Sequence, residues 1–259
     1  MKFMQLAAKV GNQIFKCRLH RWFSKPRDLK YQYELAPDLG YKIISHYRKD
    51  PANKLAELCD LYGSDKGELR TEGHPYPWSS HTYTDYYSRL LGNFRDGITK
   101  VFECGLGTNN PEIPSSMGIL GKPGASLRVW RDYFPNASVW GADIDRTVLF
   151  QEERIQTYFI DQLDTDSIEK FWEEVGVGDF DFMLDDGLHT FEAGSNLFLN
   201  SIEHLSPYGI YVIEDVSGPD LLKYKEFFKE TEFIVDYVFL TGPNPGLVDN
   251  NLVVVRKRS

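Results

Sequence analysis

The chain has 259 residues, of which 42% are hydrophobic and 26% are charged, and this composition is that of a soluble globular protein with one large domain or one domain and an appendage. The formal net charge of -9 argues against a nucleic-acid partner. No apolar run approaches the roughly 18 residues of a membrane span, and Cys17, Cys59 and Cys104 lack metal-type spacing. We therefore expect a cytoplasmic, reducing environment without membrane contact.

The segment before Asp28 carries basic residues and no acidic residue. Apolar residues from Phe3 to Leu19 fall near helical spacing, which predicts an amphipathic helix. We expect this helix to pack on the protein or on a second subunit of a homo-oligomer, and contact with a membrane surface is the alternative.

Residues 1–98 read as a helical N-terminal extension and lead-in. Helical patterning covers Tyr41–Tyr47 and Ala52–Leu61, with a break between them, and Tyr62–Gly67 is a polar, turn-rich segment. His81–Tyr87 opens a further helix. We interpret its histidine as a packing residue, and a place in the lining of a ligand pocket is the alternative.

The first predicted strand and its glycine-rich turn are Thr99–Gly107. Glu103 precedes Gly105 and Gly107, and glycines allow a backbone to approach a ligand closely. A dinucleotide-binding turn would run as G-x-G-x-x-G straight into a helix, whereas here Thr108-Asn-Asn-Pro111 follows.

An insertion rich in proline and glycine, Asn109–Ala125, follows this turn. Its position predicts either a lid over a ligand or a stiff surface loop. Ser126 is the predicted N-cap of a helix over Leu127–Phe134.

The next two predicted strands also end in polar residues. Ser138–Asp143 ends in a carboxylate that can accept both hydroxyls of a ribose, and Asp145 is a competing candidate for this role. Tyr158–Ile160 is followed by Asp161-Gln162, a candidate partner for an adenine amino group.

Two later strands end in paired carboxylates. Phe180–Asp186 is followed closely by His189, and Gly209–Asp215 ends in Glu214-Asp215. The helical crossover between them allows the strands to be parallel neighbours, with their carboxyl ends at one edge of the sheet. Asp186, Glu214 and Asp215 then form a predicted divalent-cation site.

The remaining segments complete an α/β pattern. Residues 99–259 predict a mostly parallel, seven-stranded sheet with one antiparallel strand. Its other elements are helices over Thr165–Val175 (with a solvated acidic face), Phe191–Leu205 and Leu221–Glu230, strands over Thr231–Leu240 and Leu252–Arg256, and a turn over Gly242–Gly246.

Over residues 99–256, the Glu-x-Gly-x-Gly turn, Asp143 and Asp161-Gln162 resemble the class I S-adenosylmethionine-dependent methyltransferases. Further motifs resemble the metal-dependent sugar O-methyltransferases of the mycinamicin and macrocin type. They are Tyr62-Gly-Ser-Asp-Lys-Gly67 with His81-x-Tyr83, Asp185-Asp-Gly-x-His189, and Glu214-Asp215.

This resemblance implies a Rossmann-like methyltransferase fold that binds S-adenosylmethionine and Mg²⁺ or Mn²⁺. The implied acceptor is a small molecule that contains a sugar, either nucleotide-linked or part of a glycan, from a bacterial surface polysaccharide or a natural product. Asp186, Glu214 and Asp215 would bind the metal, and His189 would act as general base with Asp186 beside it. The implied cofactor-binding residues are Glu103, Gly105, Gly107, Ser126, Asp143, Asp161, Gln162, Asp185 and Tyr83.

Three other interpretations remain open. A catechol or an antibiotic nucleus also offers oxygens to a metal, so the acceptor need not be a sugar. A nicotinamide-dependent dehydrogenase is disfavoured by the interrupted glycine motif and by the carboxylates where nicotinamide would lie. In a non-catalytic binding module, the acids at strand ends would act only as helix caps.

Overall fold

The computed structural model describes residues 42–46, 50–69, 76, 78–241, 247 and 249–258. The amphipathic helix predicted between Phe3 and Leu19 and the turn predicted at Gly242–Gly246 lie outside these residues. Of the helices that are described, none combines the length and the apolar character that a membrane span requires.

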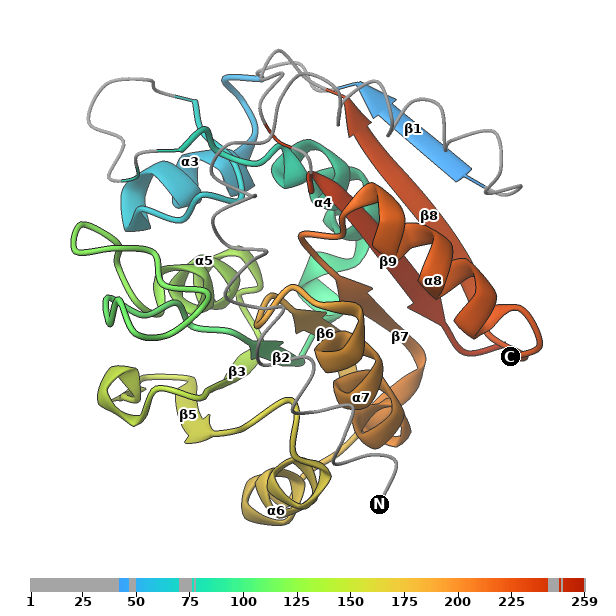
Figure 1. The fold of residues 1–259 in the computed structure, drawn as a ribbon. Helices are drawn as coiled ribbons and strands as arrows, with labels where there is room; N and C mark the ends of the chain where they lie inside the picture. Colours follow the sequence, from blue (N-terminus) through green and yellow to red (C-terminus); the bar gives the residue numbers. More distant parts are fainter. Residues whose placement is uncertain are drawn as a thin grey trace.

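The described chain forms one nine-stranded sheet in the order β1-β8-β9-β7-β6-β2-β3-β5-β4 (Figure 1). The strands run parallel except β9, which is antiparallel to β7 and β8, and the short β4, which is antiparallel to β5. Their bounds are β1 Lys42–His46, β2 Lys100–Cys104, β3 Ser138–Asp143, β4 Gln151–Glu152, β5 Ile155–Phe159, β6 Phe180–Asp185, β7 Leu205–Ile213, β8 Ile234–Thr241 and β9 Asn251–Arg256.

Helices cover both faces of this sheet, and each face has its own apolar core. One core lies under the first three helices and the other under the last three, because side chains along a strand point alternately to the two faces. In β6, Phe182 and Leu184 enter the first core, and Met183 enters the second. Phe180 also enters the second core, because the strand register shifts between Phe180 and Phe182. The helices are α3 Lys54–Tyr62, α4 Tyr83–Leu91, α5 Ala125–Tyr133, α6 Thr165–Val175, α7 Phe191–Ser201 and α8 Gly218–Phe228, with 3₁₀ turns η2 Gly92–Gly97, η3 Arg146–Val148 and η4 Ile202–His204.

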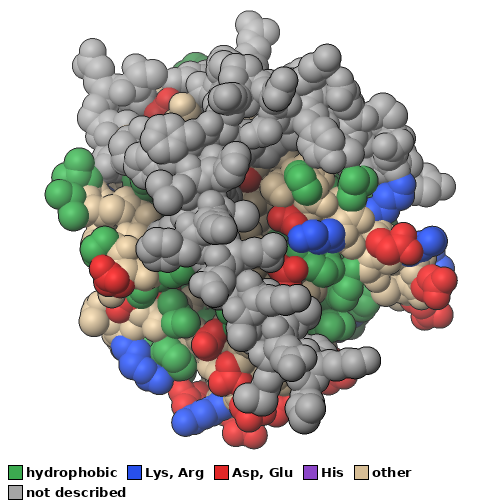
Figure 2. Space-filling model, viewed as in Figure 1, with side chains coloured by type: hydrophobic (Ala, Val, Ile, Leu, Met, Phe, Trp, Pro, Cys, Tyr) green, Lys and Arg blue, Asp and Glu red, His purple; other side chains and the backbone are tan. Residues whose placement is uncertain are grey.

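The solvated face predicted for α6 is confirmed. Ile168, Phe171 and Trp172 are buried on one side of the helix, whereas its acidic residues are exposed. Acidic side chains gather at the lower edge of the face seen in Figure 2, where Figure 1 places α6.

The predicted seven strands are all present, and two strands were not predicted. Short β4 is one of them, and β1 is the other. The helix predicted at Tyr41–Tyr47 is wrong for its described part, since Lys42–His46 pairs as a parallel strand with β8. The two adjacent isoleucines of this segment favour a strand by propensity.

Several helix and strand boundaries differ from the predicted ones. Helix α5 begins at Ala125 with Gly124 as its N-cap residue, so the prediction of Ser126 as N-cap is wrong. Gly124 has a φ of 72°, a left-handed conformation that suits glycine, and Ser126 lies in the first turn. Strand β7 begins at Leu205, within the range that was predicted to be helical.

The described lead-in packs into the sheet domain. Leu55 and Leu58 of α3 and Tyr87 of α4 share a core with Val101 of β2 and Val139 of β3. This packing brings the polar segment between α3 and α4 to the carboxyl ends of the strands.

Candidate functional site

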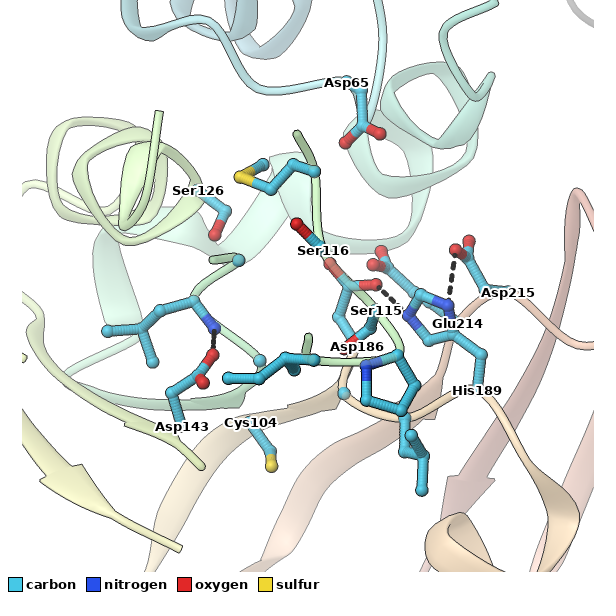
Figure 3. Close-up of a pocket in the computed structure, with 18 of the residues that line it drawn as sticks. Asp65, Cys104, Ser115, Ser116, Ser126, Asp143, Asp186, His189, Glu214 and Asp215 are labelled. Carbon is cyan, nitrogen blue, oxygen red and sulfur yellow. Dashed lines mark hydrogen bonds and ion pairs between the residues drawn. The ribbon is translucent and has the colours of Figure 1, made fainter. Parts of the chain in front are cut away.

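A cavity of about 610 Å³ lies at the carboxyl ends of the central strands (Figure 3). Strand β2 pairs with β3 on one side and with β6 on the other, so the order of the sheet reverses there. Ligands of open α/β sheets bind at this kind of reversal point. The strand ends, the lead-in and residues Ile113–Met117 of the insertion all line the cavity.

Gly105 allows the turns after β2 and β6 to touch. Its φ is 96°, and a Cβ atom built on it would lie 2.0 Å from the backbone oxygen of Asp186. A side chain at this position would therefore push the two strand ends apart. Gly107, with a φ of 78°, also has no room for a side chain, because a Cβ atom built on it would lie 2.4 Å from Met117 Sδ.

Asp143 holds the glycine-rich turn in place. Its Oδ2 accepts a hydrogen bond from the backbone N of Leu106 at 2.8 Å, and its Oδ1 accepts one from the backbone N of Asp145 at 2.8 Å. Burial raises the pKa of Asp143, although these N–H groups oppose the rise. Asp143 lines the cavity, whereas the Asp145 carboxylate bonds to Thr108 and Thr147 and caps η3. The geometry thus favours Asp143 over Asp145 as the polar group of a cofactor pocket.

Gln162 lines the same part of the cavity as Asp161, but its amide is bonded within the protein. Its Nε2 donates to Asp185 at 2.7 Å, and its Oε1 accepts from the backbone N of Leu188 at 2.8 Å. Asp185 lies behind Gln162 and beside Tyr224 of α8, and burial raises its pKa to about 6. Asp185 therefore supports the turn after β6 through Gln162.

Glu103 is fully buried beneath the cavity floor. It accepts hydrogen bonds from Trp130 Nε1 at 2.9 Å and from Ser126, and its Oε1 lies 3.1 Å from Lys66 Nζ. Burial raises the pKa of Glu103 to about 7, although Lys66 and Ser126 act to lower it. Of these residues, Ser126 and Lys66 reach the cavity wall.

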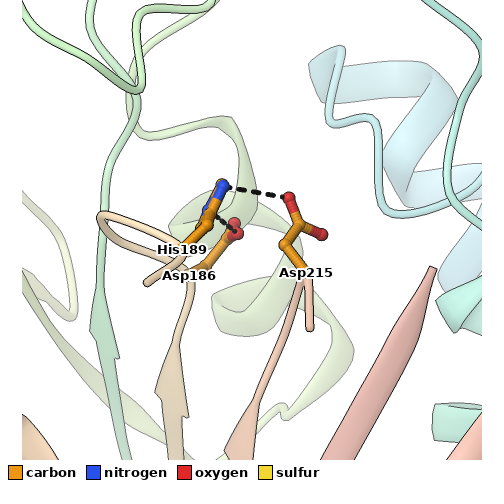
Figure 4. Close-up of side chains that lie close together, drawn as sticks. All are labelled: Asp186, His189 and Asp215. Carbon is orange, nitrogen blue, oxygen red and sulfur yellow. Dashed lines mark hydrogen bonds and ion pairs between the residues drawn. The ribbon is translucent and has the colours of Figure 1, made fainter. Parts of the chain in front are cut away.

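Asp186, His189 and Asp215 converge at the ends of β6 and β7 (Figure 4). His189 Nε2 lies 3.1 Å from Asp186 Oδ1, and His189 Nδ1 lies 3.3 Å from Asp215 Oδ2. One ligand atom from each of the three residues falls within 4.8 Å of the others. His189 and Asp215 have φ values of 57° and 54°, a left-handed conformation that is uncommon for residues other than glycine.

Glu214 lies next to this group but is bonded elsewhere. Its Oε1 accepts from the Tyr87 hydroxyl at 2.6 Å, and its Oε2 pairs with Lys66. Burial raises its pKa to about 8, and Lys66 opposes that rise. Of the three carboxylates predicted as metal ligands, Asp186 and Asp215 therefore face His189, and Glu214 faces Lys66.

Lys66 is the residue of the site that the sequence analysis did not single out. Its Nζ lies 2.7 Å from Asp186 Oδ2, contacts Glu214 and Glu103, and its side chain is only 3% exposed. Burial alone would lower its pKa, but the three carboxylates raise it well above its ordinary value. In turn, Lys66 and His189 hold the pKa of Asp186 below its usual range despite burial. In the sequence, Lys66 is one lysine within a polar turn, and the carboxylates that it contacts lie far along the chain.

Tyr83 and His81 hold Asp215 from the lead-in. The Tyr83 hydroxyl donates to Asp215 Oδ1, and the His81 ring stacks on Tyr83 with centroids 4.8 Å apart. His81 Nε2 lies 3.3 Å from Asp215 Oδ1. Burial lowers the pKa of His81, but Asp215, Asp249 and Asp65 outweigh burial and raise it to about 10. His81 also lines the cavity, in agreement with the alternative interpretation of this histidine.

Replacing Lys66 by Met should lower the free energy of unfolding by about 3–5 kcal/mol, because Glu103 and Glu214 would stay buried without a cationic partner. Urea denaturation measures the change. Lys54→Met is the matched control, since Lys54 pairs with Glu57 at the exposed surface, where such pairs contribute at most about 1 kcal/mol. Equal losses in both variants would contradict a structural role for the buried ion pairs.

Comparisons with known proteins agree with the motifs. No protein-family model matches the chain. It is 32% identical over 162 residues to the 8-demethyl-8-alpha-L-rhamnosyl tetracenomycin-C 2'-O-methyltransferase of Streptomyces olivaceus, a match that covers 62% of this chain and 37% of that protein. It is also 31% identical over 160 residues to the demethylmacrocin O-methyltransferase of Streptomyces fradiae, a match that covers 61% of this chain and 38% of that protein.

A solved structure extends this likeness to three dimensions. The MycE methyltransferase from the mycinamycin biosynthetic pathway, in complex with Mg, SAH and mycinamycin VI, superimposes with a TM-score of 0.54 at 26% identity over 79% of this chain. The resemblance to the sugar O-methyltransferases is confirmed. The fold is the Rossmann-like fold of the class I methyltransferases. The chain matches well under half the length of each curated relative and 54% of the MycE chain.

Proposed function

We propose that this protein transfers a methyl group from S-adenosylmethionine to a sugar hydroxyl with the help of a divalent cation. The observation that carries the proposal is the meeting of two half-sites in one cavity. A glycine-rich turn with Asp143 lies at β2 and β3, and Asp186, His189 and Asp215 lie at β6 and β7. The relatives named above are O-methyltransferases, and MycE is described in complex with Mg and SAH.

The β2–β3 half fits the cofactor. S-adenosylmethionine supplies an electrophilic methyl group on a sulfonium. The Asp143 carboxylate already accepts two backbone hydrogen bonds, and it keeps lone pairs for the two hydroxyls of a ribose. Gly105 and Gly107 let the backbone approach the ligand, and Asp161 and Gln162 line the part of the cavity proposed for adenine.

The β6–β7 half fits a divalent metal. Asp186 and Asp215 offer hard oxygen ligands of the kind that Mg²⁺ and Mn²⁺ prefer, and Glu214 is adjacent. When bound, such a cation lowers the pKa of a hydroxyl group beside it. We propose Asp186, Glu214 and Asp215 as the residues that hold it, with Lys66, Tyr83 and Tyr87 orienting their carboxylates.

His189 is the proposed general base. It lies between Asp186 and Asp215 and is partly exposed to the cavity, and its neutral form can take the hydroxyl proton on a ring nitrogen. The oxygen then attacks the methyl group in line, and positioning of the two substrates supplies most of the acceleration.

The proposed acceptor is a nucleotide-linked or glycan sugar from a bacterial surface polysaccharide or a natural product. The relatives' names, which specify a rhamnosyl tetracenomycin and demethylmacrocin, favour a natural-product glycoside. Incubation with methyl-labelled S-adenosylmethionine and panels of glycosides, nucleotide sugars and catechols tests this directly. Labelling of catechols alone would replace the sugar with a non-sugar acceptor.

Asp143→Asn should weaken binding of S-adenosylhomocysteine roughly tenfold or more, because a charged acceptor of two hydrogen bonds becomes neutral. Calorimetry measures the affinity. The matched control is Asp145→Asn, which should bind normally because its carboxylate bonds to Thr108 and Thr147. Normal binding by the folded Asp143 variant, or binding of NAD by the wild type, would contradict this cofactor assignment.

A further inference from the structure

The cavity has an aromatic wall that the proposed chemistry does not use. Trp78 lines it, and its indole Nε1 donates to Asp65 Oδ2 at 2.9 Å. The ring of Tyr76 stacks on the indole with centroids 5.0 Å apart and an interplanar angle of 28°. Tyr76 is itself held, because its hydroxyl donates to the carbonyl of Gly63. Trp78 is therefore fixed at its polar edge and supported on one face.

His81 connects this wall to the acidic residues. Its Nδ1 lies 4.0 Å from Asp65 Oδ2, and its Nε2 lies 3.3 Å from Asp215 Oδ1. A single imidazole ring thus separates the two carboxylates. In Figure 3, Asp65 and His189 project into the cavity from opposite sides.

We propose that Trp78 and Asp65 form the subsite that holds the acceptor sugar ring beside His189. This inference rests on the proposed function. A pyranose presents a face of C–H bonds and a rim of hydroxyls. The C–H face suits the negative face of an indole, and the hydroxyls suit a carboxylate that is 22% exposed. One apolar platform with a few convergent polar groups is the usual composition of a small-molecule site.

This subsite is separate from the part of the cavity that is proposed to bind the cofactor. Asp143 and Asp161 belong to the ends of β3 and β5, whereas Asp65 and Trp78 belong to the lead-in. The backbone bonds from His81 N to Asp65 O and from Tyr83 N to Lys66 O tie this part of the lead-in together. A sugar ring held there would lie against the Asp186, His189 and Asp215 cluster, where its hydroxyl has to react.

The test compares Trp78→Phe with Trp78→Leu, because both replacements are apolar and only phenylalanine keeps an aromatic face. Trp140→Phe is the matched control, since Trp140 packs on Phe180 in the sheet. Binding of a panel of neutral methyl glycosides is measured by saturation-transfer NMR and calorimetry, in the presence of S-adenosylhomocysteine and Mn²⁺. Trp78→Leu should weaken glycoside binding about tenfold, Trp78→Phe should weaken it less, and Trp140→Phe should leave it unchanged.

Affinities for S-adenosylhomocysteine and Mn²⁺ should stay at wild-type values in all three variants, and a normal thermal unfolding curve shows that each is folded. Glycoside binding that is equal in Trp78→Leu and wild type, or equally weakened in both Trp78 variants, would overturn the stacking role. Lost cofactor affinity would assign Trp78 to the methyl donor instead. A wild-type protein that binds cofactor and Mn²⁺ but no glycoside would overturn the sugar acceptor itself.

Discussion

Replacing His189 by Ala should lower the methyl-transfer rate by about 10²–10⁴, the usual contribution of a general base. The imidazole lies between Asp186 and Asp215 at the cavity wall, and no other described histidine contacts both carboxylates. The variant should still bind S-adenosylhomocysteine, because the Asp143 half of the cavity is untouched. The wild-type rate should fall as the pH is lowered, since a protonated imidazole cannot accept the hydroxyl proton.

His204→Ala is the matched control, because His204 stacks on Trp172 away from the cavity. Its rate should stay near that of the wild type. If His189 only orients the carboxylates, its loss would weaken metal binding, and excess Mg²⁺ would restore turnover. Titration of the His189 variant with Mg²⁺ distinguishes these roles, and recovery to near the wild-type rate would mean that another group is the base.

Removing divalent cations with EDTA should abolish activity, and adding Mg²⁺ or Mn²⁺ should restore it. Without the cation, a sugar hydroxyl has too high a pKa to yield its proton readily at neutral pH. Direct Mn²⁺ binding, measured by electron paramagnetic resonance, provides a readout that does not depend on turnover. Asp215→Asn should bind Mn²⁺ at least tenfold more weakly, because a charged oxygen ligand is lost.

Asp161→Asn serves as the control for metal binding, since Asp161 lines the cavity but follows β5 and lies outside the cluster with His189. Its Mn²⁺ affinity should match that of the wild type. Full turnover in EDTA would make the acidic residues structural and would leave the methyl transfer without a metal.

Most of the fold was predictable because local patterns determine it. Thr165–Val175 is helical over the predicted range, the strand that ends at Asp143 occurs as predicted, and the strand before Asp186 ends one residue earlier than predicted, at Asp185. The strand at Lys42–His46 was not predicted, because its short segment also fits helical spacing and its partner β8 follows almost 200 residues later. Pairing over that separation leaves no local signal.

The acidic residues of the site could be predicted from the sequence, but the residues that contact them could not. Asp186, Glu214, Asp215 and His189 were visible because each follows an apolar strand. Lys66 pairs with residues 120 and 148 positions away, and sequence spacing says nothing about contacts of that range. The contacts of the three carboxylates with His189 and Lys66 therefore needed coordinates.

The left-handed backbone conformation of His189 and Asp215 lowers the stability of the fold at two positions whose side chains the proposed reaction requires. Both residues adopt a conformation that glycine takes without a Cβ clash and that costs other residues of order 1 kcal/mol. A glycine there would relieve the backbone only by deleting the imidazole or the carboxylate. Such a stabilising substitution would consequently remove a side chain of the proposed active centre, so thermostable variants have to be sought at other positions.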